Sequence, residues 1–208
     1  MPDHPRKRVM FEILTVCTGN ICRSPLAETL LRTRLAPYHP LVHSAGTMGL
    51  ESAPMTPEAV RLALGLGIAQ DLAANHRSRY LTDAELRSPD LILAMSREHR
   101  RRIVEIAPGR LRSAFTVREF ARLAADTSDE QIAAASATGG VDGRARARAA
   151  VAAVAAQRGM SAPPADPGDD DVIDPYRRSW ETYQLSASQL VPAVDQVVRV
   201  MSIAMTAR

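Results

Sequence analysis

Apolar segments of two kinds alternate along the first 120 residues, and this alternation constrains the fold more than any other feature. Short runs of β-branched and aliphatic residues, typical of buried strands, occupy residues 9–16, 41–45, 90–95 and 114–117. Apolar residues recur at helical spacing over residues 25–36 and 96–107. Because strands that alternate with helices pair in parallel, the sequence predicts a parallel sheet covered by helices.

Capping residues mark the ends of two further helices. Thr56 and Pro57 predict the first turn of a helix that ends near residues 65–67, where two glycines stand. The spacing of Thr82 and Glu85 predicts a capping box at the start of a short helix. Both helices fall between the second and third predicted strands.

Alanine dominates residues 121–162, where it makes up 16 of 42 positions. Helices are predicted over residues 129–137 and 142–158. We interpret residues 124–171 as an Ala-rich helical insertion within a single domain spanning 1–208, and expect either a solvated appendage or a packing helix. A long amphipathic helix is predicted over residues 186–205, from its apolar stripe.

Composition and charge exclude several classes of protein. With 46% apolar and 24% charged residues, the chain is globular rather than disordered, and no run approaches the ~20 apolar residues of a membrane helix. Basic residues 6–8 precede an apolar run, but that run is short and contains Glu12, which argues against a signal peptide. We therefore expect a cytoplasmic protein with reduced thiols. The net charge of +3 comes from arginine and does not indicate a nucleic-acid partner.

The loop after the first predicted strand carries the strongest functional signal. It reads Cys17-Thr18-Gly19-Asn20-Ile21-Cys22-Arg23-Ser24-Pro25, with Ser24 expected as helix cap and Pro25 at the first helical position. Gly19 and Asn20 tolerate left-handed backbone, which a loop with inward-pointing amides needs. Loop amides and a helix N-terminus around one point bind a dianion such as phosphate.

A thiol at that point becomes a nucleophile. The helix dipole, the loop amides and Arg23 all favour the thiolate form of Cys17. The planar guanidinium of Arg23 binds two phosphoryl oxygens and can follow them into the transition state. Ser24 can direct its hydroxyl at the thiolate as well as cap its helix.

Two other readings of the cysteine pair are weaker. Buried packing cysteines do not require Gly19 and Asn20 between them. A zinc half-site needs further ligands, and the histidines of the chain show no metal spacing with Cys17 and Cys22. Those histidines are His4, His39, His43, His76 and His99. We therefore expect no metal and no other cofactor.

The segment from Cys17 to Glu28 resembles the signature of the low-molecular-weight protein tyrosine phosphatases of bacterial type. Further matches are Ser44-Ala45-Gly46-Thr47, Ser78-Arg79 and residues 90–95, and the resemblance covers residues 9–120 and 172–205. It implies a flavodoxin-like, three-layer α/β/α fold with a central four-stranded parallel sheet and the phosphate loop after the first strand. It also implies hydrolysis of phosphotyrosine through a cysteinyl-phosphate.

A general acid is also needed, because a phenolate leaves poorly without a proton. Among Asp166, the run at residues 169–171, and Asp174, we select Asp174, since Pro175 restricts it and Tyr176 supplies an aromatic wall for a substrate ring. The sequence Asp174-Pro175-Tyr176 also resembles the general-acid loop of the family. The acidic run before it is expected to be a solvated loop.

The remaining candidate residues surround this site. Met48 and Leu50 are expected at the pocket rim. The phosphate- and substrate-binding set is predicted to be Thr18, Gly19, Asn20, Ile21, Cys22, Ser24, Met48 and Tyr176, beside the catalytic Cys17, Arg23 and Asp174. The resemblance suggests a reversible Cys17–Cys22 disulfide, with a small buried residue at Cys22 as the equal alternative. We interpret His76 as a surface histidine rather than a support of the loop, and residues 100–102, all arginine, as a solvated face.

Three rival functions are weighed against a tyrosine phosphatase. Arsenate reduction in relatives uses further downstream cysteines, and no cysteine follows Cys22. Phosphoarginine hydrolysis is associated with threonine where this chain has Ile21. A non-catalytic phosphate-binding module does not need Cys17, Arg23 and Asp174 together. The family further suggests a phosphotyrosine protein as substrate, a bacterial tyrosine kinase among the candidates, with no nucleic acid and no membrane insertion.

Overall fold

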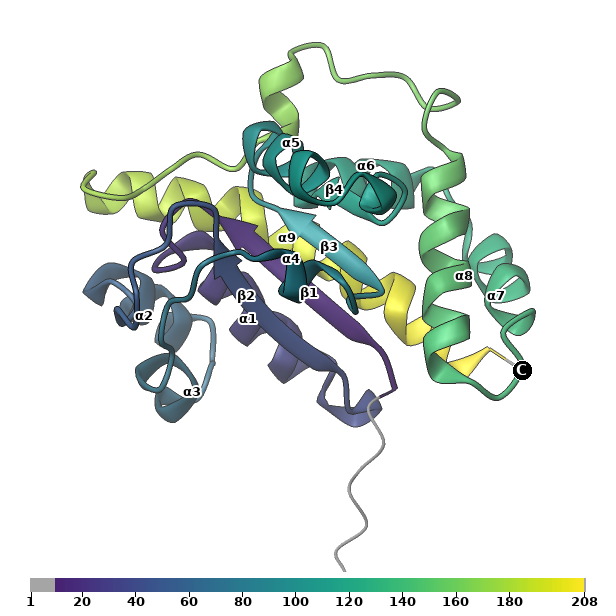
Figure 1. Ribbon diagram of the computed structural model, residues 1–208, viewed down its shortest axis with the longest axis horizontal. Coiled ribbons are helices and arrows are strands. Elements are labelled where there is room, and N and C mark those ends of the chain that lie inside the picture. The colour runs from purple at the N-terminus through teal and green to yellow at the C-terminus, as the bar shows by residue number, and fades with distance from the viewer. Residues whose placement is uncertain (1–9, 208) are drawn as a thin grey trace, which may run out of the picture.

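A computed structural model describes residues 10–207 and contains one parallel sheet (Figure 1). The strands are β1 (Glu12–Cys17), β2 (Leu41–Gly46), β3 (Leu91–Ala94) and β4 (Ala114–Thr116), in the order β2-β1-β3-β4. This confirms the predicted four-stranded parallel sheet and the flavodoxin-like order. The expected first strand began at Val9, which lies outside the described residues, as do the basic residues 6–8 and His4.

Nine α-helices and three short 3₁₀ helices join and cover the strands within residues 10–207. The α-helices are α1 (Arg23–Arg34), α2 (Pro57–Gly65), α3 (Gln70–Ala74), α4 (Asp83–Leu86), α5 (Arg97–Ile106), α6 (Val117–Ala125), α7 (Asp129–Ala137), α8 (Gly143–Ala156) and α9 (Trp180–Thr206). The 3₁₀ helices are η1 (Ala36–Tyr38), η2 (Pro108–Arg110) and η3 (Pro167–Asp170). None of these helices has the length and apolar character that crossing a membrane requires.

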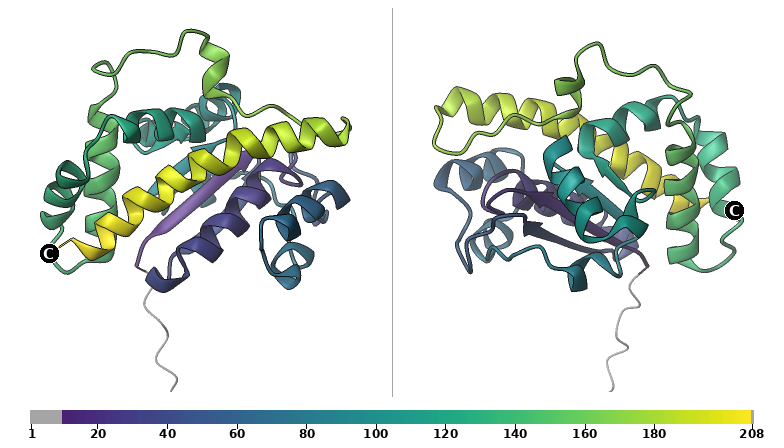
Figure 2. Two further views of the ribbon diagram at one scale, coloured as in Figure 1. Left: turned by 180° about the vertical axis from the view of Figure 1, so that it is seen from behind. Right: turned by 45° about the horizontal axis from the view of Figure 1, so that its top comes forward.

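Two apolar layers hold the helices on the sheet. Alternate strand residues, among them Ile13, Leu93 and Phe115, face a large core shared with α1, α6 and α9. Leu14 and Ile92 face the opposite side, against α4 and α5. Strand side chains alternate between faces, and both faces are covered, so the strands read as continuous apolar runs. Figure 2 shows α9 crossing the back of the sheet beside α1.

Several predicted helix boundaries were wrong. Helix α1 begins at Arg23 with Cys22 at its N-cap, so Ser24 does not cap it and Pro25 is not its first residue. The hydroxyl of Thr82 makes no capping bond, so the predicted capping box does not form. Helix α9 begins at Trp180, six residues before the predicted start. Its first turns are fixed by tertiary contacts, since Tyr183 is buried and the Arg61 guanidinium stacks 4.0 Å from the Trp180 ring.

Two helices were missed altogether, α3 and α6. Helix α6 lies between the last strand and the Ala-rich segment, and a capping box of Thr116 and Glu119 starts it. The rings of Phe115 and Phe120 meet edge to face, with centroids 5.2 Å apart. Because the strand prediction ran to Val117, it covered the helix start.

The Ala-rich helices pack on the domain rather than extend into solvent. Ile132 from α7 and Ala147, Ala150 and Val154 from α8 are fully buried in the larger core. Alanine suits such close packing, because its small side chain lets helices approach one another. Figure 1 shows α7 and α8 beside the C-terminal half of α9. Of the two expected structures, the packing helix is therefore confirmed and the solvated appendage is wrong.

Ion pairs also tie α8 to the sheet. The Asp90 carboxylate, which is buried, accepts bonds from Arg144 (3.1 Å) and Arg148 (2.6 Å) and from the backbone N–H of Glu12 (2.8 Å). The buried Glu12 carboxylate pairs with His43 at 3.0 Å and with Arg144 at 3.3 Å. Buried carboxylates are tolerated only when paired in this way, so removing one partner lowers the stability of the fold.

Part of the predicted solvated face on α5 is half-buried instead. The Arg100 Nε donates to the Ala114 carbonyl oxygen (2.9 Å), and Arg100 pairs with Glu119 at 3.5 Å. Arg101 and Arg102 are exposed, as predicted, and both pair with Glu105. The reason is position on the helix: Arg100 lies on the side that meets β4.

Substitution of Val154 by alanine should test whether the Ala-rich helices contribute to the core. This side chain is fully buried, so Val154→Ala should lower the free energy of unfolding by about 1 to 3 kcal/mol through the cavity it leaves. The matched control is Val141→Ala in the α7–α8 turn, where the side chain is 100% exposed and the change should stay within about 0.5 kcal/mol. Urea unfolding measures both. Equal values for the two variants would contradict the packing.

Candidate active site

The loop from β1 to α1 lies at the carboxyl edge of the sheet. The connection from β1 leads to β2 on one side and the connection from β3 leads to β4 on the other, so the strand order reverses between β1 and β3. Ligands in open parallel sheets bind at such a switch point. Cys17 ends β1 and Arg23 begins α1, so the loop amides and the N-terminal turn of α1 surround the space above the sheet.

The Cys17 sulfur is surrounded by polar groups. It is only 2% exposed; its Sγ lies 3.0 Å from the Ser24 Oγ and accepts from the Asn20 backbone N–H at 3.3 Å. The Ser24 Oγ also accepts from the Asn20 Nδ2 (2.9 Å), and its own proton has two acceptors within reach, the sulfur and, at a longer 3.5 Å, the Ala45 carbonyl oxygen. The Ser24 hydroxyl thus lies next to the sulfur, and Ser24 does not cap the helix.

Asn20 holds the loop in its inward-facing shape. Its φ of 55° is in the left-handed region, as predicted for a residue of this type. Its Nδ2 also donates to the Ser44 Oγ (2.7 Å), its Oδ1 accepts from the Arg79 N–H (3.0 Å), and its carbonyl oxygen lies 2.7 Å from the His76 Nε2. The prediction that His76 lies on the surface was wrong: it is buried, and burial lowers its pKa.

Gly46 lets the end of β2 pack directly against this loop. A Cβ on Gly46 would lie 2.6 Å from the Thr18 carbonyl oxygen and 3.1 Å from the Asn20 Cβ. The backbone N–H groups of Thr47 and Met48 donate to the carbonyl oxygens of Cys17 (2.9 Å) and Thr18 (3.0 Å). These bonds turn the loop carbonyls toward β2 and leave the inner side of the loop to its amides.

Arg23 joins the loop to a segment far away in the sequence. Its Nη1 donates to the Val172 carbonyl oxygen at 3.0 Å, and its Nη2 lies 2.8 Å from the Asp174 Oδ2. The Nη2 also makes a long 3.4 Å contact with the Thr18 Oγ1. The Arg23 Nε is buried and has no partner among residues 10–207. The guanidinium is therefore fixed in place through its two terminal nitrogens.

Thr18 connects Arg23 to a histidine that the sequence analysis did not select. The His99 Nε2 lies 2.8 Å from the Thr18 Oγ1, and its Nδ1 lies 2.8 Å from the Ser96 Oγ. Burial, with the charge of Arg23, lowers the pKa of His99 to about 4. The neutral ring can accept the Thr18 proton, since Arg23 is always the donor in its own contact with Thr18. The sequence did offer one signal for this contact: His99 falls in the first turn of the helix that follows the third strand.

Asp174 is held near Arg23 by the segment that precedes it. The Val172 N–H donates to the Met95 carbonyl oxygen at 2.9 Å, and Asp171 pairs with Arg97 at 3.1 Å. The Tyr176 N–H donates to the Asp174 Oδ1 at 3.2 Å. The expectation that the acidic run is only a solvated loop was wrong, because Asp171 and Asp170 are both ion-paired, Asp170 with Arg122.

Cys22 lines the same pocket as Cys17 but has different partners. Its Sγ lies 3.5 Å from the Thr56 Oγ1 and 3.6 Å from the Tyr183 hydroxyl. Burial raises the pKa of the Cys22 thiol, and it also raises the pKa of Tyr183. Both cysteines are free thiols in this structure. The disulfide between them stays a prediction of the family resemblance.

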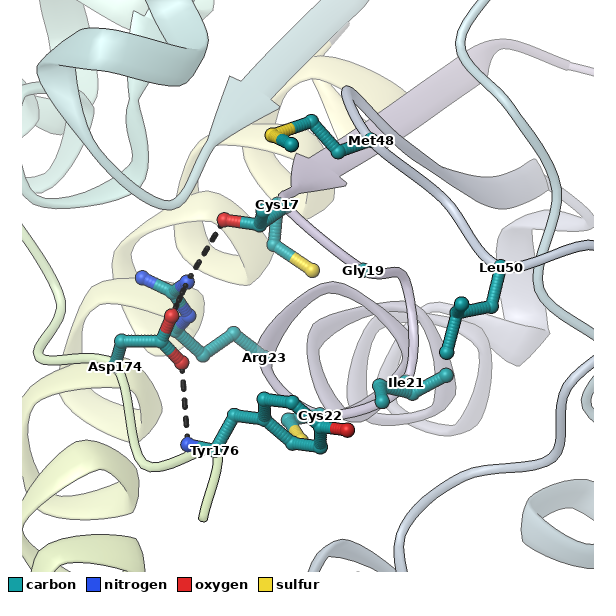
Figure 3. A pocket seen from close by; sticks show the side chains of 10 residues that line it. Cys17, Gly19, Ile21, Cys22, Arg23, Met48, Leu50, Asp174 and Tyr176 are labelled. Atoms are coloured by element: carbon teal, nitrogen blue, oxygen red, sulfur yellow. Dashed lines mark hydrogen bonds and ion pairs between the residues drawn. The ribbon is translucent and has the colours of Figure 1, made fainter. Parts of the chain in front are cut away.

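A pocket of about 220 Å³ opens above the loop (Figure 3). Its lining includes every predicted site residue except Asn20 and Ser24, which lie beneath the loop, and it also includes the predicted rim residue Leu50; the full set is Cys17, Thr18, Gly19, Ile21, Cys22, Arg23, Met48, Leu50, Asp174 and Tyr176. Met48 and Leu50 lie on one side, and Asp174 and Tyr176 on the other. Anionic and aromatic parts of one ligand would fit this combination of cationic base and apolar walls.

Comparison with known proteins agrees with this geometry. The model of the family described as "Low molecular weight phosphotyrosine protein phosphatase" matches residues 12–133. The Etp low molecular weight protein-tyrosine-phosphatase of Escherichia coli K12 is 46% identical over 96 residues, which cover 46% of this chain and 62% of that protein. The protein-arginine-phosphatase of Bacillus subtilis is 38% identical over 113 residues, covering 52% of this chain and 71% of that protein.

Solved structures give the same result for the fold. The low molecular weight protein tyrosine phosphatase of T. tengcongensis is 27% identical with a TM-score of 0.62, covering 90% of this chain and 97% of that chain. The YwlE arginine phosphatase of Geobacillus stearothermophilus is 26% identical with a TM-score of 0.61, covering 90% of each chain. On its sequence match and its fold, the chain belongs to the low molecular weight phosphotyrosine protein phosphatase family.

Proposed function

We propose that this protein is a protein tyrosine phosphatase that hydrolyses phosphotyrosine monoesters through a cysteinyl-phosphate intermediate. The observation that supports this most directly is the convergence of a thiol, a fixed guanidinium and a carboxylate on one small pocket. Cys17 and Arg23 line its base, and Asp174 stands at its side, paired with Arg23. We assign Cys17 as nucleophile, Arg23 as phosphate-binding residue and Asp174 as general acid.

In the first step the Cys17 thiolate attacks phosphorus opposite the phenolic oxygen. A sulfur–phosphorus bond forms, the bond between phosphorus and the phenolic oxygen breaks, and Asp174 gives its proton to the departing oxygen. Arg23 and the loop amides bind the three non-bridging oxygens, whose negative charge is spread in the transition state. Ser24 stabilises the thiolate before attack.

In the second step water attacks the phosphorus of the cysteinyl-phosphate. Asp174, now ionised, accepts a proton from that water, the sulfur–phosphorus bond breaks, and inorganic phosphate and the Cys17 thiolate are released. The hydrogen bond from Ser24 to the sulfur favours Cys17 as the leaving group. The enzyme returns to its starting state.

Tyrosine is favoured as the phosphorylated residue over arginine. Tyr176 offers a ring face to a phenyl group, and Ile21 and Met48 give apolar contact. Phosphoarginine is the second candidate, because protein-arginine-phosphatases are among the relatives at 38% identity. Arsenate reduction and simple phosphate binding fit less well, since no cysteine follows Cys22 and the pocket carries a complete set of reacting groups.

The substrate is taken to be a phosphotyrosine protein, with a bacterial tyrosine kinase as a candidate from the family resemblance. A cytoplasmic location suits the chemistry, because its reducing conditions keep Cys17 as a free thiol. A test of the function as a whole is hydrolysis of p-nitrophenyl phosphate without added metal, with a burst of p-nitrophenol equal to the enzyme concentration and inhibition by vanadate. Absence of turnover would overturn the proposal.

Removal of the nucleophile should abolish turnover. Cys17→Ser should keep the circular dichroism spectrum and the affinity for inorganic phosphate while phosphate release from substrate falls to background. Its oxygen is a far weaker nucleophile than the thiolate of Cys17. Measurable burst kinetics in this variant would show that Cys17 is not the attacking group.

Removal of the general acid should show a dependence on the leaving group. With phenyl phosphate, Asp174→Asn should lower kcat by about 100-fold or more, since an unprotonated phenolate leaves poorly. With p-nitrophenyl phosphate, whose leaving group needs less help, the loss should be much smaller. Asp166→Asn is the matched control, because Asp166 accepts a bond from Gly168 in η3 and does not line the pocket. Equal losses for both substrates would contradict the assignment of Asp174.

Loss of the Thr18 hydroxyl should weaken phosphate binding through Arg23. Thr18→Val keeps the shape of the side chain but removes the hydrogen bonds of its hydroxyl to Arg23 and to His99. The inhibition constant of vanadate should therefore rise about 2- to 10-fold. His99→Gln should add little in the Thr18→Val background if His99 acts through Thr18. Thr33→Val, at an exposed position of α1, is the control and should leave vanadate inhibition unchanged. Additive effects of the two site substitutions would mean that His99 acts independently.

Ile21 should influence the choice between phosphotyrosine and phosphoarginine. Ile21→Thr should raise the ratio of phosphoarginine to phosphotyrosine hydrolysis by about 3- to 10-fold, because a hydroxyl replaces apolar surface at the pocket wall. Initial rates on paired peptides that differ only in the phosphorylated residue measure the ratio. An unchanged or lower ratio would remove Ile21 from the basis of specificity.

A further inference from the structure

A groove runs along the outer side of α5 and is separate from the catalytic pocket. Three cavities of about 450, 300 and 390 Å³ follow one another there. The first shares Arg112 and Ala152 with the second, and it shares Arg100 and Leu111 with the third, so the three are continuous. One wall is α8, the longer of the two Ala-rich helices, which stands at the right of Figure 1 next to α7.

Arginine dominates the lining of this groove, which we call the arginine groove. Helix α5 contributes Arg97, Arg100 and Arg101; η2 and the turn after it contribute Arg110 and Arg112; and α8 with the residues after it contributes Arg148 and Arg158. The lining contains two carboxylates, Asp90 and Glu105, and two more, Glu119 and Asp171, pair with lining arginines from outside it. The seven arginines outnumber these four carboxylates, so the groove carries an excess of positive charge.

Two of these arginines make no ion pair with any residue of the described part of the chain. Arg110 donates to the backbone carbonyl oxygens of Leu86 and Arg87, which carry no net charge. Arg112 is exposed and has no hydrogen-bond partner among residues 10–207 either. Burial, followed by the nearby charge of Arg148, lowers the pKa of Arg110, while the carboxylates of Asp90 and Glu12 act in the opposite direction. A bound anion would act in the same direction as those carboxylates.

The other arginines are partnered in a way that fixes their direction. Arg158 donates to Glu119 at 2.8 Å and to the Ala114 carbonyl oxygen at 2.7 Å, and its guanidinium lies 3.8 Å from the Phe115 ring centroid. Arg148 is held by the buried Asp90 carboxylate. Fixed guanidinium groups lose little side-chain entropy when they bind a carboxylate, and their fork geometry matches it.

The shape of the groove suits an extended peptide. Ala152, Ala155 and Ala156 form the α8 wall, where small side chains leave room next to the arginines. The groove extends to Arg97, whose partner Asp171 lies three residues before Asp174. A polypeptide whose phosphotyrosine occupies the catalytic pocket could therefore continue along α5.

We propose that the arginine groove binds an acidic segment of the protein substrate. This rests on the proposed function, since it assigns the substrate class of the same enzyme: a phosphoprotein with Glu- or Asp-rich sequence near the phosphorylated residue. Helix α8 forms one wall of this groove. The Ala-rich segment thereby has a role in substrate selection. Small aryl phosphates do not reach the groove and are unaffected by it.

Direct binding of a peptide tests the groove without using catalysis. The probe is a fluorescein-labelled oligoglutamate, and fluorescence anisotropy is read on full-length Cys17→Ser protein at low and physiological salt. We expect saturable binding that weakens with salt. The double variant Arg101→Glu with Arg112→Glu should weaken it by about tenfold or more. Both positions are exposed, and neither belongs to the catalytic pocket.

A control of equal charge separates the groove from general electrostatics. Arg87→Glu with Arg102→Glu makes the same change in net charge at exposed positions that do not line the three cavities, and should keep the affinity within about twofold. Equal weakening by both double variants, or no binding to the parent protein, overturns the proposal. A labelled single-stranded DNA of equal charge is measured in the same way. If it binds more tightly than the oligoglutamate, and the Arg101→Glu, Arg112→Glu variant loses that binding, the assignment to an acidic peptide is overturned.

Kinetics on the active enzyme complete the test. The groove variant should keep the parent kcat/KM on p-nitrophenyl phosphate and lose about tenfold on a phosphotyrosine peptide with an acidic extension, relative to the same peptide with a neutral extension. Equal kcat/KM of the parent enzyme on the two peptides overturns the proposal. If p-nitrophenyl phosphate is not hydrolysed at all, the proposed function fails, while the anisotropy result still decides whether the groove binds acidic peptides.

Discussion

The left-handed backbone at Asn20, with the hydrogen bonds that hold it, is the constraint on which the site depends. Turning the chain there points the Asn20 N–H at the Cys17 sulfur and places the Asn20 side chain between Ser24 and Ser44. The carbonyl oxygen of Asn20 then faces His76. Without the hydrogen bonds of Asn20 nothing would hold this turn of the loop, and the Cys17 sulfur would lose the N–H donor that points at it.

Arg23 connects this loop to a distant part of the chain. The residue begins α1 and makes its strongest contacts with Val172 and Asp174, the first of them 149 positions away. The acid loop is thereby placed against the phosphate loop, and further bonds from Met95 and Arg97 hold its approach. Cys17 and Asp174 lie near opposite ends of the chain, so their spacing is set by packing between distant segments.

The Ala-rich segment extends the same domain rather than standing apart from it. Its apolar positions enter the common core, and its arginines pair with carboxylates of the sheet and of α6. These contacts account for part of the preference for arginine over lysine in this chain. Some guanidinium groups hold α8 to buried carboxylates, whereas Arg110 and Arg112 make no ion pair within residues 10–207 and contribute to the charge of the outer groove.

The sequence by itself determined the parallel sheet and the loop that begins at Cys17 and ends at Arg23, because strand periodicity, loop chemistry and residue spacing are local properties. It also selected Asp174 over its acidic neighbours, through Pro175 and Tyr176. Only the tertiary structure decided the burial of His76, the contact of His99 with Thr18, the first residues of α1 and α9, and the packing of α7 and α8. Each of these depends on contacts between segments far apart in the chain, and such contacts outweigh the local preferences of a cap, a histidine or a run of alanines.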